Sequence, residues 1–100
     1  MELDNSLEKQ INKGISYIKN NELAEAQKIF EHITNDKKSE LIGYFFLGII
    51  QIKKKKLTVA KSFFNKILIV EPYNQDANLN LGLVLLEEKN YEKAILFFDK

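Results

Sequence analysis

Three kinds of residue recur in this sequence at an interval of 34 residues, always in the same order. They are a glycine, an alanine and a phenylalanine: Gly14, Gly48 and Gly82; Ala26, Ala60 and Ala94; Phe30, Phe64 and Phe98. A fixed period of this length is the signature of stacked helix pairs, because each period supplies one helix–turn–helix unit. The period therefore predicts an all-α fold, and it moves the question of function from catalysis towards binding.

Polar breaks divide the chain into six predicted helices. Apolar residues recur at helical spacing between the breaks, as at Leu7, Ile11, Ile15 and Ile18. Ser39 and Asn90 are expected N-caps, and Pro72 ends the fourth helix, since proline disfavours helix in the residue before it. The predicted helices cover residues 4–20, 22–34, 39–54, 56–70, 74–88 and 90–100.

The three in-phase glycines lie midway along the first helix of each predicted pair. A glycine inside a helix costs roughly 1 kcal/mol relative to alanine, so three of them need an offsetting gain. We expect that gain to be a close approach of the second helix, at the matching alanine of each pair. The phenylalanine one turn further on would fill the gap between the two helices.

Composition narrows the class of protein. Among the 100 residues, 45% are hydrophobic, and the net charge of +1 gives no general attraction to nucleic acid or to an anionic membrane. The chain has no cysteine, so disulfides and thiolate metal sites are excluded. The first ten residues are too polar for a secretory signal, and the apolar stretch from Leu41 to Ile52 is shorter than the roughly 20 residues that span a bilayer. We expect a cytoplasmic protein without membrane insertion.

The repeated residues resemble the tetratricopeptide repeat. The third repeat is most similar, through Asn78, Leu79, Asn80, Leu81, Gly82, Leu85, Tyr91, Ala94 and Phe98, and the second carries Tyr44, Leu47, Gly48, Leu57, Ala60, Phe64 and Pro72. The first keeps Gly14, Tyr17, Ala26 and Phe30, but has the polar Gln10 and Lys13 where the family has large apolar residues. The resemblance implies a right-handed α-solenoid of six antiparallel helices. Residues 1–100 would form one array, with repeats over about 7–40, 41–74 and 75–100, the last incomplete.

The resemblance also implies a function. Such repeats are usually non-enzymatic scaffolds that hold a peptide or helix in a concave groove lined by the first helix of each pair. Carried over to this sequence, the groove-facing positions are all apolar: Ile11, Ile15, Ile18, Phe45, Ile49, Ile52, Leu79, Leu83 and Leu86. Monomeric soluble proteins rarely leave such a patch uncovered, so we expect a protein partner, either an apolar peptide or an amphipathic helix. The alternative is that these residues are covered by the protein's own further helices or by a second copy.

One branch of the family clamps an acidic C-terminal peptide with lysine, asparagine and arginine. The matching positions here are Ile11, Ile15, Phe46, Asp76 and Asn80, which include no cation. The sequence therefore argues against this type of ligand.

Other candidate sites have simpler explanations. The run Lys53 to Lys56 is read as a solvated turn after a helix, where cations interact favourably with the helix dipole. His32 is the only histidine, which makes a metal site a poor interpretation. Carboxylate pairs such as Glu87 and Glu88 lie on polar faces and indicate no acid–base catalysis. We expect no enzyme activity, no cofactor and no metal in these residues.

The sequence stops at Lys100, within the predicted sixth helix, after the apolar residues Ile95 to Phe98. Terminal repeats normally present a polar face, so we expect either a piece of a longer protein or a homo-oligomer, and favour the first. Three functions remain open: an interaction scaffold, a self-associating structural module, and a substrate-presenting N-terminal arm of a larger enzyme such as a glycosyltransferase.

Overall fold

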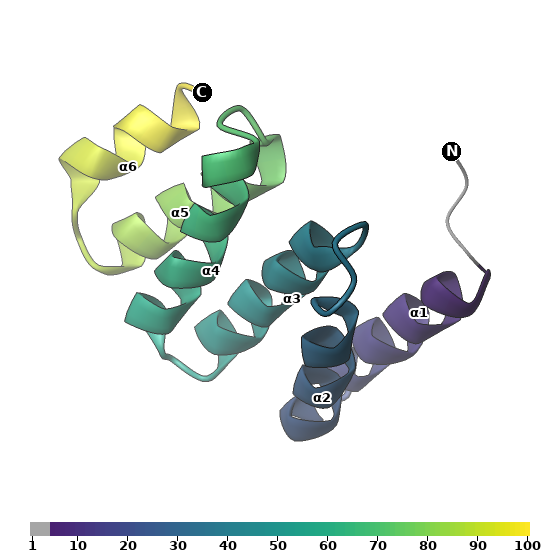
Figure 1. Ribbon diagram of the computed structural model, residues 1–100. Helices are drawn as coiled ribbons and strands as arrows, with labels where there is room; N and C mark the ends of the chain where they lie inside the picture. Colours follow the sequence, from purple (N-terminus) through teal and green to yellow (C-terminus); the bar gives the residue numbers. More distant parts are fainter. Residues whose placement is uncertain (1–4) are drawn as a thin grey trace.

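The computed structural model describes residues 5–100, which contain six α-helices and no strand. Each helix packs against the next one along the chain, so that the helices form successive pairs (Figure 1). The all-α repeat fold is thereby confirmed. The helices are α1 (Asn5–Lys19), α2 (Leu23–Ile33), α3 (Glu40–Lys53), α4 (Leu57–Val70), α5 (Gln75–Glu87) and α6 (Tyr91–Phe98).

The helix boundaries differ from the predicted ones mainly at the two ends. The predicted start at residue 4 lies outside the described residues. The last helix was expected to continue to residue 100, but α6 ends at Phe98 and Asp99 is its C-cap. The predicted cap at Asn90 is confirmed, because its side chain accepts a hydrogen bond from the backbone N–H of Lys93. Ser39 precedes α3, yet its hydroxyl donates to the carbonyl of Ile33 at 2.9 Å instead of capping the helix.

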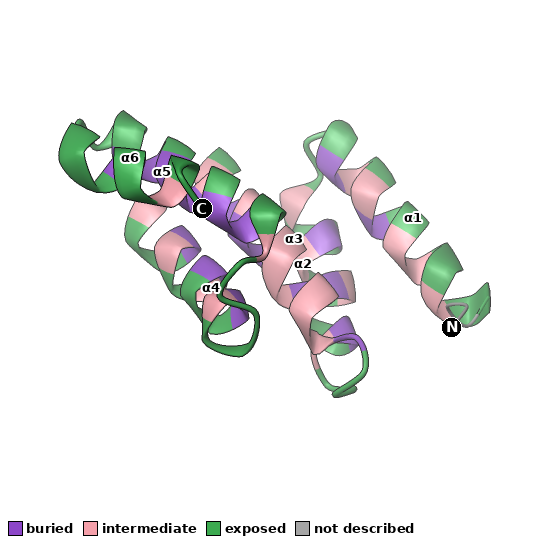
Figure 2. Ribbon diagram, turned by 90° about the horizontal axis from the view of Figure 1, so that it is seen from above, coloured by how far each residue is buried: buried purple, intermediate pink, exposed green. Residues whose placement is uncertain are grey.

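Buried residues lie on the helix faces that are turned towards neighbouring helices (Figure 2). They form two clusters that follow the chain. The first joins α1, α2 and α3 around Phe30, and the second joins α4, α5 and α6 around Phe64. Residues of α3 such as Tyr44 and Phe45 pack against the second cluster, so that α3 links the two halves of the core.

The in-phase glycines allow the close approach that their spacing predicts. A Cβ atom added to Gly14 would lie 2.5 Å from the ring of Phe30, and one added to Gly48 would lie 2.6 Å from the ring of Phe64. A Cβ on Gly82 would overlap the ring of Phe98 in the same way. Each phenylalanine ring therefore lies directly over a glycine of its own pair, and the absence of a side chain there makes room for the ring.

The turn inside each helix pair has one conformation, repeated three times. Asn21, Lys55 and Lys89 all have positive φ angles, of 60°, 64° and 65°. In each turn the backbone N–H of the following residue donates to a carbonyl five residues back, at 2.8 to 2.9 Å. This is the Schellman arrangement, which ends a helix and satisfies its last carbonyls. The 34-residue period thus extends to backbone geometry.

The turn between α4 and α5 is fixed by side chains. Asn74 caps α5 by accepting a hydrogen bond from the backbone N–H of Ala77 at 2.9 Å. The buried Asn78 amide donates to the carbonyls of Pro72 and Asn74. These bonds hold the first turn of α5 to the turn that precedes it.

Candidate functional site

The nine positions predicted to face a groove differ in burial along the chain. Ile18 on α1 is buried in the first core cluster. Five are half-buried: Ile11 and Ile15 on α1, and Phe45, Ile49 and Ile52 on α3. Only the three on α5 are exposed, with Leu79 at 50%, Leu83 at 47% and Leu86 at 39%.

The gradient in burial follows from the stacking of helix pairs. The three positions on α3 pack against the cluster formed by α4, α5 and α6, so the following helix pair covers part of each side chain. Within the described residues, no helix pair follows α5 and α6. Leu79, Leu83 and Leu86 therefore keep the accessible area that the equivalent residues of α3 lose.

A cavity of about 220 Å³ lies where the α3 and α5 positions meet. Three of the nine predicted residues, Ile49, Ile52 and Leu83, line it, so α3 and α5 bring these side chains together. The predicted positions on α1 are not among its lining residues. The rest of its lining is Lys53, Asn80, Val84 and Glu87.

The cavity has an apolar interior and a charged edge. Glu87 also lies 3.6 Å from the ammonium of Lys55, as an exposed ion pair between the end of α5 and the turn after α3. The amide of Asn80 donates to the carbonyl of Asp76 on its own helix at 2.8 Å. Phe46, at another of the positions that would clamp a carboxylate, is stacked on Phe30 with ring centres 4.6 Å apart. None of these positions carries a cation, so the structure offers no carboxylate clamp at them.

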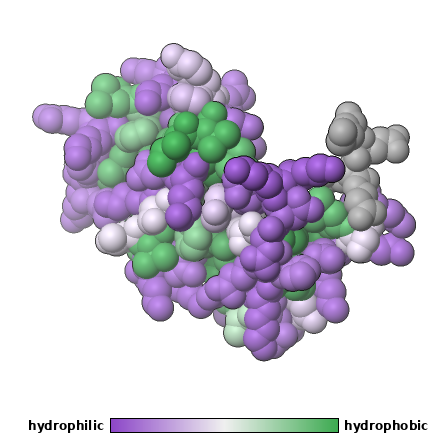
Figure 3. Space-filling view, in the orientation of Figure 1, coloured by the Kyte–Doolittle hydropathy of each residue, from purple (hydrophilic) through white to green (hydrophobic). Residues whose placement is uncertain are grey.

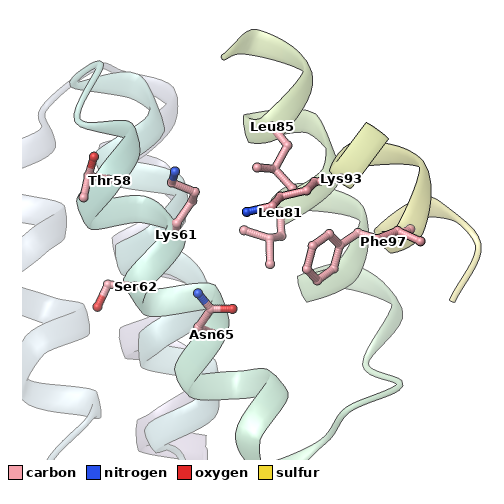
Figure 4. A pocket seen from close by; sticks show the side chains of 9 residues that line it. Thr58, Lys61, Ser62, Asn65, Leu81, Leu85, Lys93 and Phe97 are labelled. Carbon is pink, nitrogen blue, oxygen red and sulfur yellow. The ribbon is translucent and has the colours of Figure 1, made fainter. Parts of the chain in front are cut away.

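A second cavity, of about 720 Å³, was not predicted from the sequence. It lies between α4 and α6, and Leu81 and Leu85 of α5 also line it (Figure 4). Thr58, Lys61, Ser62 and Asn65 approach from α4, and Lys93, Leu96 and Phe97 from α6. Leu96 stands 34 residues after the polar Ser62, but this exchange of a polar for an apolar residue does not by itself indicate a cavity.

The lysine run Lys53 to Lys56 forms a turn, as predicted. Lys53 ends α3, Lys54 is the C-cap, Lys55 has the positive φ angle, and Lys56 precedes α4. The ammonium of Lys54 donates to the side-chain oxygen of Gln27 on α2 at 2.7 Å. The run thus forms the turn between the two helices of one pair, and Lys54 also links that pair to α2 of the preceding pair.

Two further features concern metal ions and membranes. His32 is exposed on the last turn of α2, and among residues 5–100 the histidine and acidic side chains form no group of three that could hold a metal ion. Within the same residues, no helix combines the length and the apolar character needed to cross a bilayer.

A comparison with protein-family models matches the C-terminal part of the chain. Residues 75–100, which contain α5 and α6, match the family model described as the tetratricopeptide repeat. Repeats of this family generally mediate interactions between proteins and are typically non-enzymatic. No match to the chain was found among curated proteins.

Proposed function

Since the three helix pairs and the match over residues 75–100 fit a protein of the tetratricopeptide-repeat type, we propose that this chain is a scaffold for protein–protein interaction. It binds a partner helix or peptide in an apolar concave groove lined by α1, α3 and α5. The chain acts as one array, with repeats over about 7–40, 41–74 and 75–100. The proposal includes no catalytic step, no cofactor and no metal, and it places the protein in the cytoplasm.

The proposal rests on the exposed leucine stripe of α5, which consists of Leu79, Leu83 and Leu86. The stripe lies beside the cavity that Leu83 lines together with Ile49 and Ile52. Covering one large aliphatic side chain is worth about 1.5–3 kcal/mol. Three half-exposed leucines on one helix face therefore favour a ligand that covers them together. The half-buried residues of α1 and α3 extend the apolar surface without adding as much accessible area.

The shape of the surface indicates the chemistry of the partner. The cavity of about 220 Å³ suits one large apolar side chain, whereas the leucine stripe along α5 suits a row of them. An amphipathic helix presents such a row at every third or fourth residue. Lys53 and Glu87 at the edge of the cavity carry opposite charges, so polar residues of either sign fit beside the apolar row.

The test is a selection of displayed amphipathic helices on the wild-type chain, followed by binding measurements with two variants. Leu83→Asp puts a carboxylate in the leucine stripe, and we expect the selected helices to bind it at least about tenfold more weakly. The matched control is Leu96→Asp, because Leu96 is also an exposed leucine, at 62% compared with 47% for Leu83, and lies outside the predicted groove. Both variants should keep the helical circular dichroism of the wild type.

Selected helices that bind Leu83→Asp and Leu96→Asp equally well would contradict the groove. Sedimentation of the unliganded chain separates self-association from partner binding. A dimer that dissociates on Leu83→Asp would mean that a second copy, instead of a partner, covers the stripe.

A further inference from the structure

The cavity of about 720 Å³ between α4 and α6 has one polar wall and one apolar wall. Its polar wall belongs to α4 and carries two hydroxyls and an amide, from Thr58, Ser62 and Asn65. Leu81 and Leu85 of α5 are only 2% and 5% exposed and form a buried floor. In the space-filling view, hydrophobic and hydrophilic residues are intermingled over the surface formed by α4 to α6 (Figure 3). Pockets that bind small molecules typically measure about 300–1,000 Å³, so the cavity is large enough for one.

The lining residues of α5 and α6 differ in character from their equivalents in the preceding repeat. Leu85, Lys93 and Leu96 stand 34 residues after Gln51, Val59 and Ser62. The core contact shared by the repeats does not require these exchanges, since Gly48 and Gly82 both lie under a phenylalanine ring. The exchanges therefore change the cavity lining and leave the repeated packing intact.

Phe97 lacks the ring contact that its equivalent makes. Phe63, 34 residues earlier, stacks on Tyr44 with ring centres 6.2 Å apart. The residue that corresponds to Tyr44 is Asn78, whose amide is bonded to backbone carbonyls of the turn before α5. Among residues 5–100 no aromatic ring pairs with Phe97. Its ring lines the cavity instead, beside Leu81 (Figure 4).

The lining contains two ammonium groups, from Lys61 and Lys93, and no carboxylate. Lys61 is held by Glu88, the C-cap of α5, at 2.8 Å. The ammonium of Lys93 makes no ion pair or hydrogen bond with any of residues 5–100. Its side chain extends from α6 across the cavity towards α4 (Figure 4). The cavity thus combines apolar surface with a cation that the described residues leave unpaired.

This combination favours one class of ligand over the others. A cationic ligand would be repelled by the two ammonium groups. A purely apolar ligand would displace water from the Lys93 ammonium without replacing its hydrogen bonds, which costs free energy. Nucleic acid is bound through many phosphate contacts, whereas only one of the two cations here is unpaired. A ligand with one negative charge and an apolar body satisfies both the ammonium and the leucines.

We propose that the cavity between α4 and α6 binds a small amphipathic monocarboxylate, such as a free fatty acid of medium chain length. Its carboxylate pairs with the ammonium of Lys93, and its alkyl chain lies on Leu81, Leu96 and Phe97. None of the nine predicted groove residues lines this cavity. The site is therefore independent of the groove on α1, α3 and α5, and it adds a small-molecule ligand to a protein proposed to bind a helix or peptide.

The experiment follows the backbone amide signals of the 100-residue chain by NMR during titration with octanoate. We expect saturable binding up to about 2 mM, with the largest shifts at Ser62, Leu96 and Phe97 and none at Ile49 or Leu83. Octanol, which has the same chain without the charge, should bind several-fold more weakly. Octyltrimethylammonium, which reverses the charge, should bind more weakly still. Hexanoate should lose up to about fourfold in affinity for each methylene removed.

Three variants of the chain test the two parts of the site. Lys93→Gln should weaken octanoate several-fold and leave octanol unchanged. The matched control is Lys89→Gln, because Lys89 is an exposed lysine four residues earlier that does not line the cavity, and it should leave both affinities unchanged. Leu96→Ser, at an exposed position, introduces the residue found 34 positions earlier and should weaken octanoate and octanol alike, by about threefold or more.

The proposal is overturned if octanoate does not bind saturably up to about 2 mM, or if octanol binds equally well. Equal effects of Lys93→Gln and Lys89→Gln would show that no specific ammonium is recognised. The largest shifts at Ile49 and Leu83 would place the amphiphile in the groove instead. If the unliganded chain sediments as a dimer that Leu96→Ser dissociates, a second copy occupies the cavity and the proposal is wrong. Loss of helix binding in the groove would change none of these outcomes.

Discussion

At the scale of single residues, the repeated contact between a glycine and a phenylalanine ring is the most exacting feature of the core. The ring of Phe64 fills the space that a Cβ atom at position 48 would need, and the rings of Phe30 and Phe98 do the same over Gly14 and Gly82. A glycine that helix propensity disfavours is thus retained because the packing requires it.

Gly48→Ala should therefore destabilise the protein, although alanine is the better helix former by about 1 kcal/mol. The added Cβ would lie 2.6 Å from the ring of Phe64, and overpacking of this kind typically costs about 1–3 kcal/mol. We expect a net decrease in the free energy of unfolding, measured by urea denaturation.

Phe64 supplies the control for this prediction. The combination of Gly48→Ala with Phe64→Leu should lose less stability than the sum of the two single changes, because the smaller side chain relieves the overlap. Strict additivity, or a more stable Gly48→Ala variant, would show that the ring does not restrict this position.

Because the glycine, the alanine and the phenylalanine each recur every 34 residues, the sequence predicted a close approach of the two helices, with the alanine at the glycine and the phenylalanine filling the gap one turn further on. In the structure the phenylalanine ring itself lies over the glycine. It did not predict that Lys55 and Lys89 adopt positive φ angles. Asparagine and glycine are the usual residues in that conformation, and a lysine gives no compositional sign of it. Only the geometry of the turn identifies those two positions.

At the scale of helices and turns, the C-terminal ends of α1, α3 and α5 are fixed by backbone hydrogen bonds more than by side-chain caps. The Schellman turns after α1, α3 and α5 are alike although their sequences differ. The conformation is therefore imposed by the packing of the two helices that each turn joins.

Lys55→Gly should stabilise the protein by up to about 1 kcal/mol, because glycine adopts a positive φ angle without the steric cost that lysine bears. The exposed ion pair between Lys55 and Glu87 would be lost, and such pairs contribute little. The measurement is the free energy of unfolding from urea denaturation.

Lys53→Gly is the matched change, since Lys53 belongs to the same run but ends α3 with helical geometry. It should destabilise the protein by up to about 1 kcal/mol. If both glycine variants are destabilised equally, the strain inferred at Lys55 is absent.

Within the described residues, every predicted helix boundary lies within two residues of the observed one, because apolar periodicity and polar breaks coincide. The largest difference is at α6, which ends at Phe98 instead of residue 100. The role of Ser39 was not predictable. The Ser39 hydroxyl is bonded to the carbonyl of Ile33, six residues back, which depends on how the turn folds over the end of α2.

At the scale of the whole molecule, the two ends of the array differ. All eleven exposed large hydrophobic residues among residues 5–100 lie after position 58. The outer face of α1 is polar, whereas α5 and α6 expose leucines, Ile95 and Phe98. Among residues 5–58 the large apolar side chains are buried or half-buried, so most of the accessible apolar area lies at the other end of the array.

The rates of amide hydrogen exchange should also differ between the two ends of the array. α6 has eight residues and packs mainly against α5, whereas α3 and α4 each lie between two neighbours. In stacked arrays, local opening is easiest where a helix has fewest neighbours. We expect amides in the middle of α6 to exchange at least about tenfold faster than those of α3 and α4 in hydrogen-exchange experiments followed by NMR.

The longer helix α1 also has one main neighbour and serves as the comparison within the same sample. Its amides should be protected to an intermediate extent, because its outer face is polar and its inner face is buried. Equal protection of α6 and α4 would indicate that the array opens only as one unit.

The candidate groove was predictable only in part. The 34-residue phase identified which side chains share one stripe, but their burial depends on the helix pair that follows each of them. Ile49 and Leu83 are equivalent in sequence and differ in exposure because α5 covers only the first. The cavity between α4 and α6 could not be inferred, since it depends on how far apart two second helices lie.

The polar face of α1 also restricts which gene duplications the protein could tolerate. A tandem copy of residues 41–74 would insert a unit whose covering face, with Gly43, Leu47 and Ile50, is already suited to pack on a second helix. A tandem copy of residues 7–40 would instead place Lys9, Lys13 and Ser16 in that contact, and would bury charge without a partner. Lengthening of such an array by duplication is therefore expected from its middle unit and not from its first.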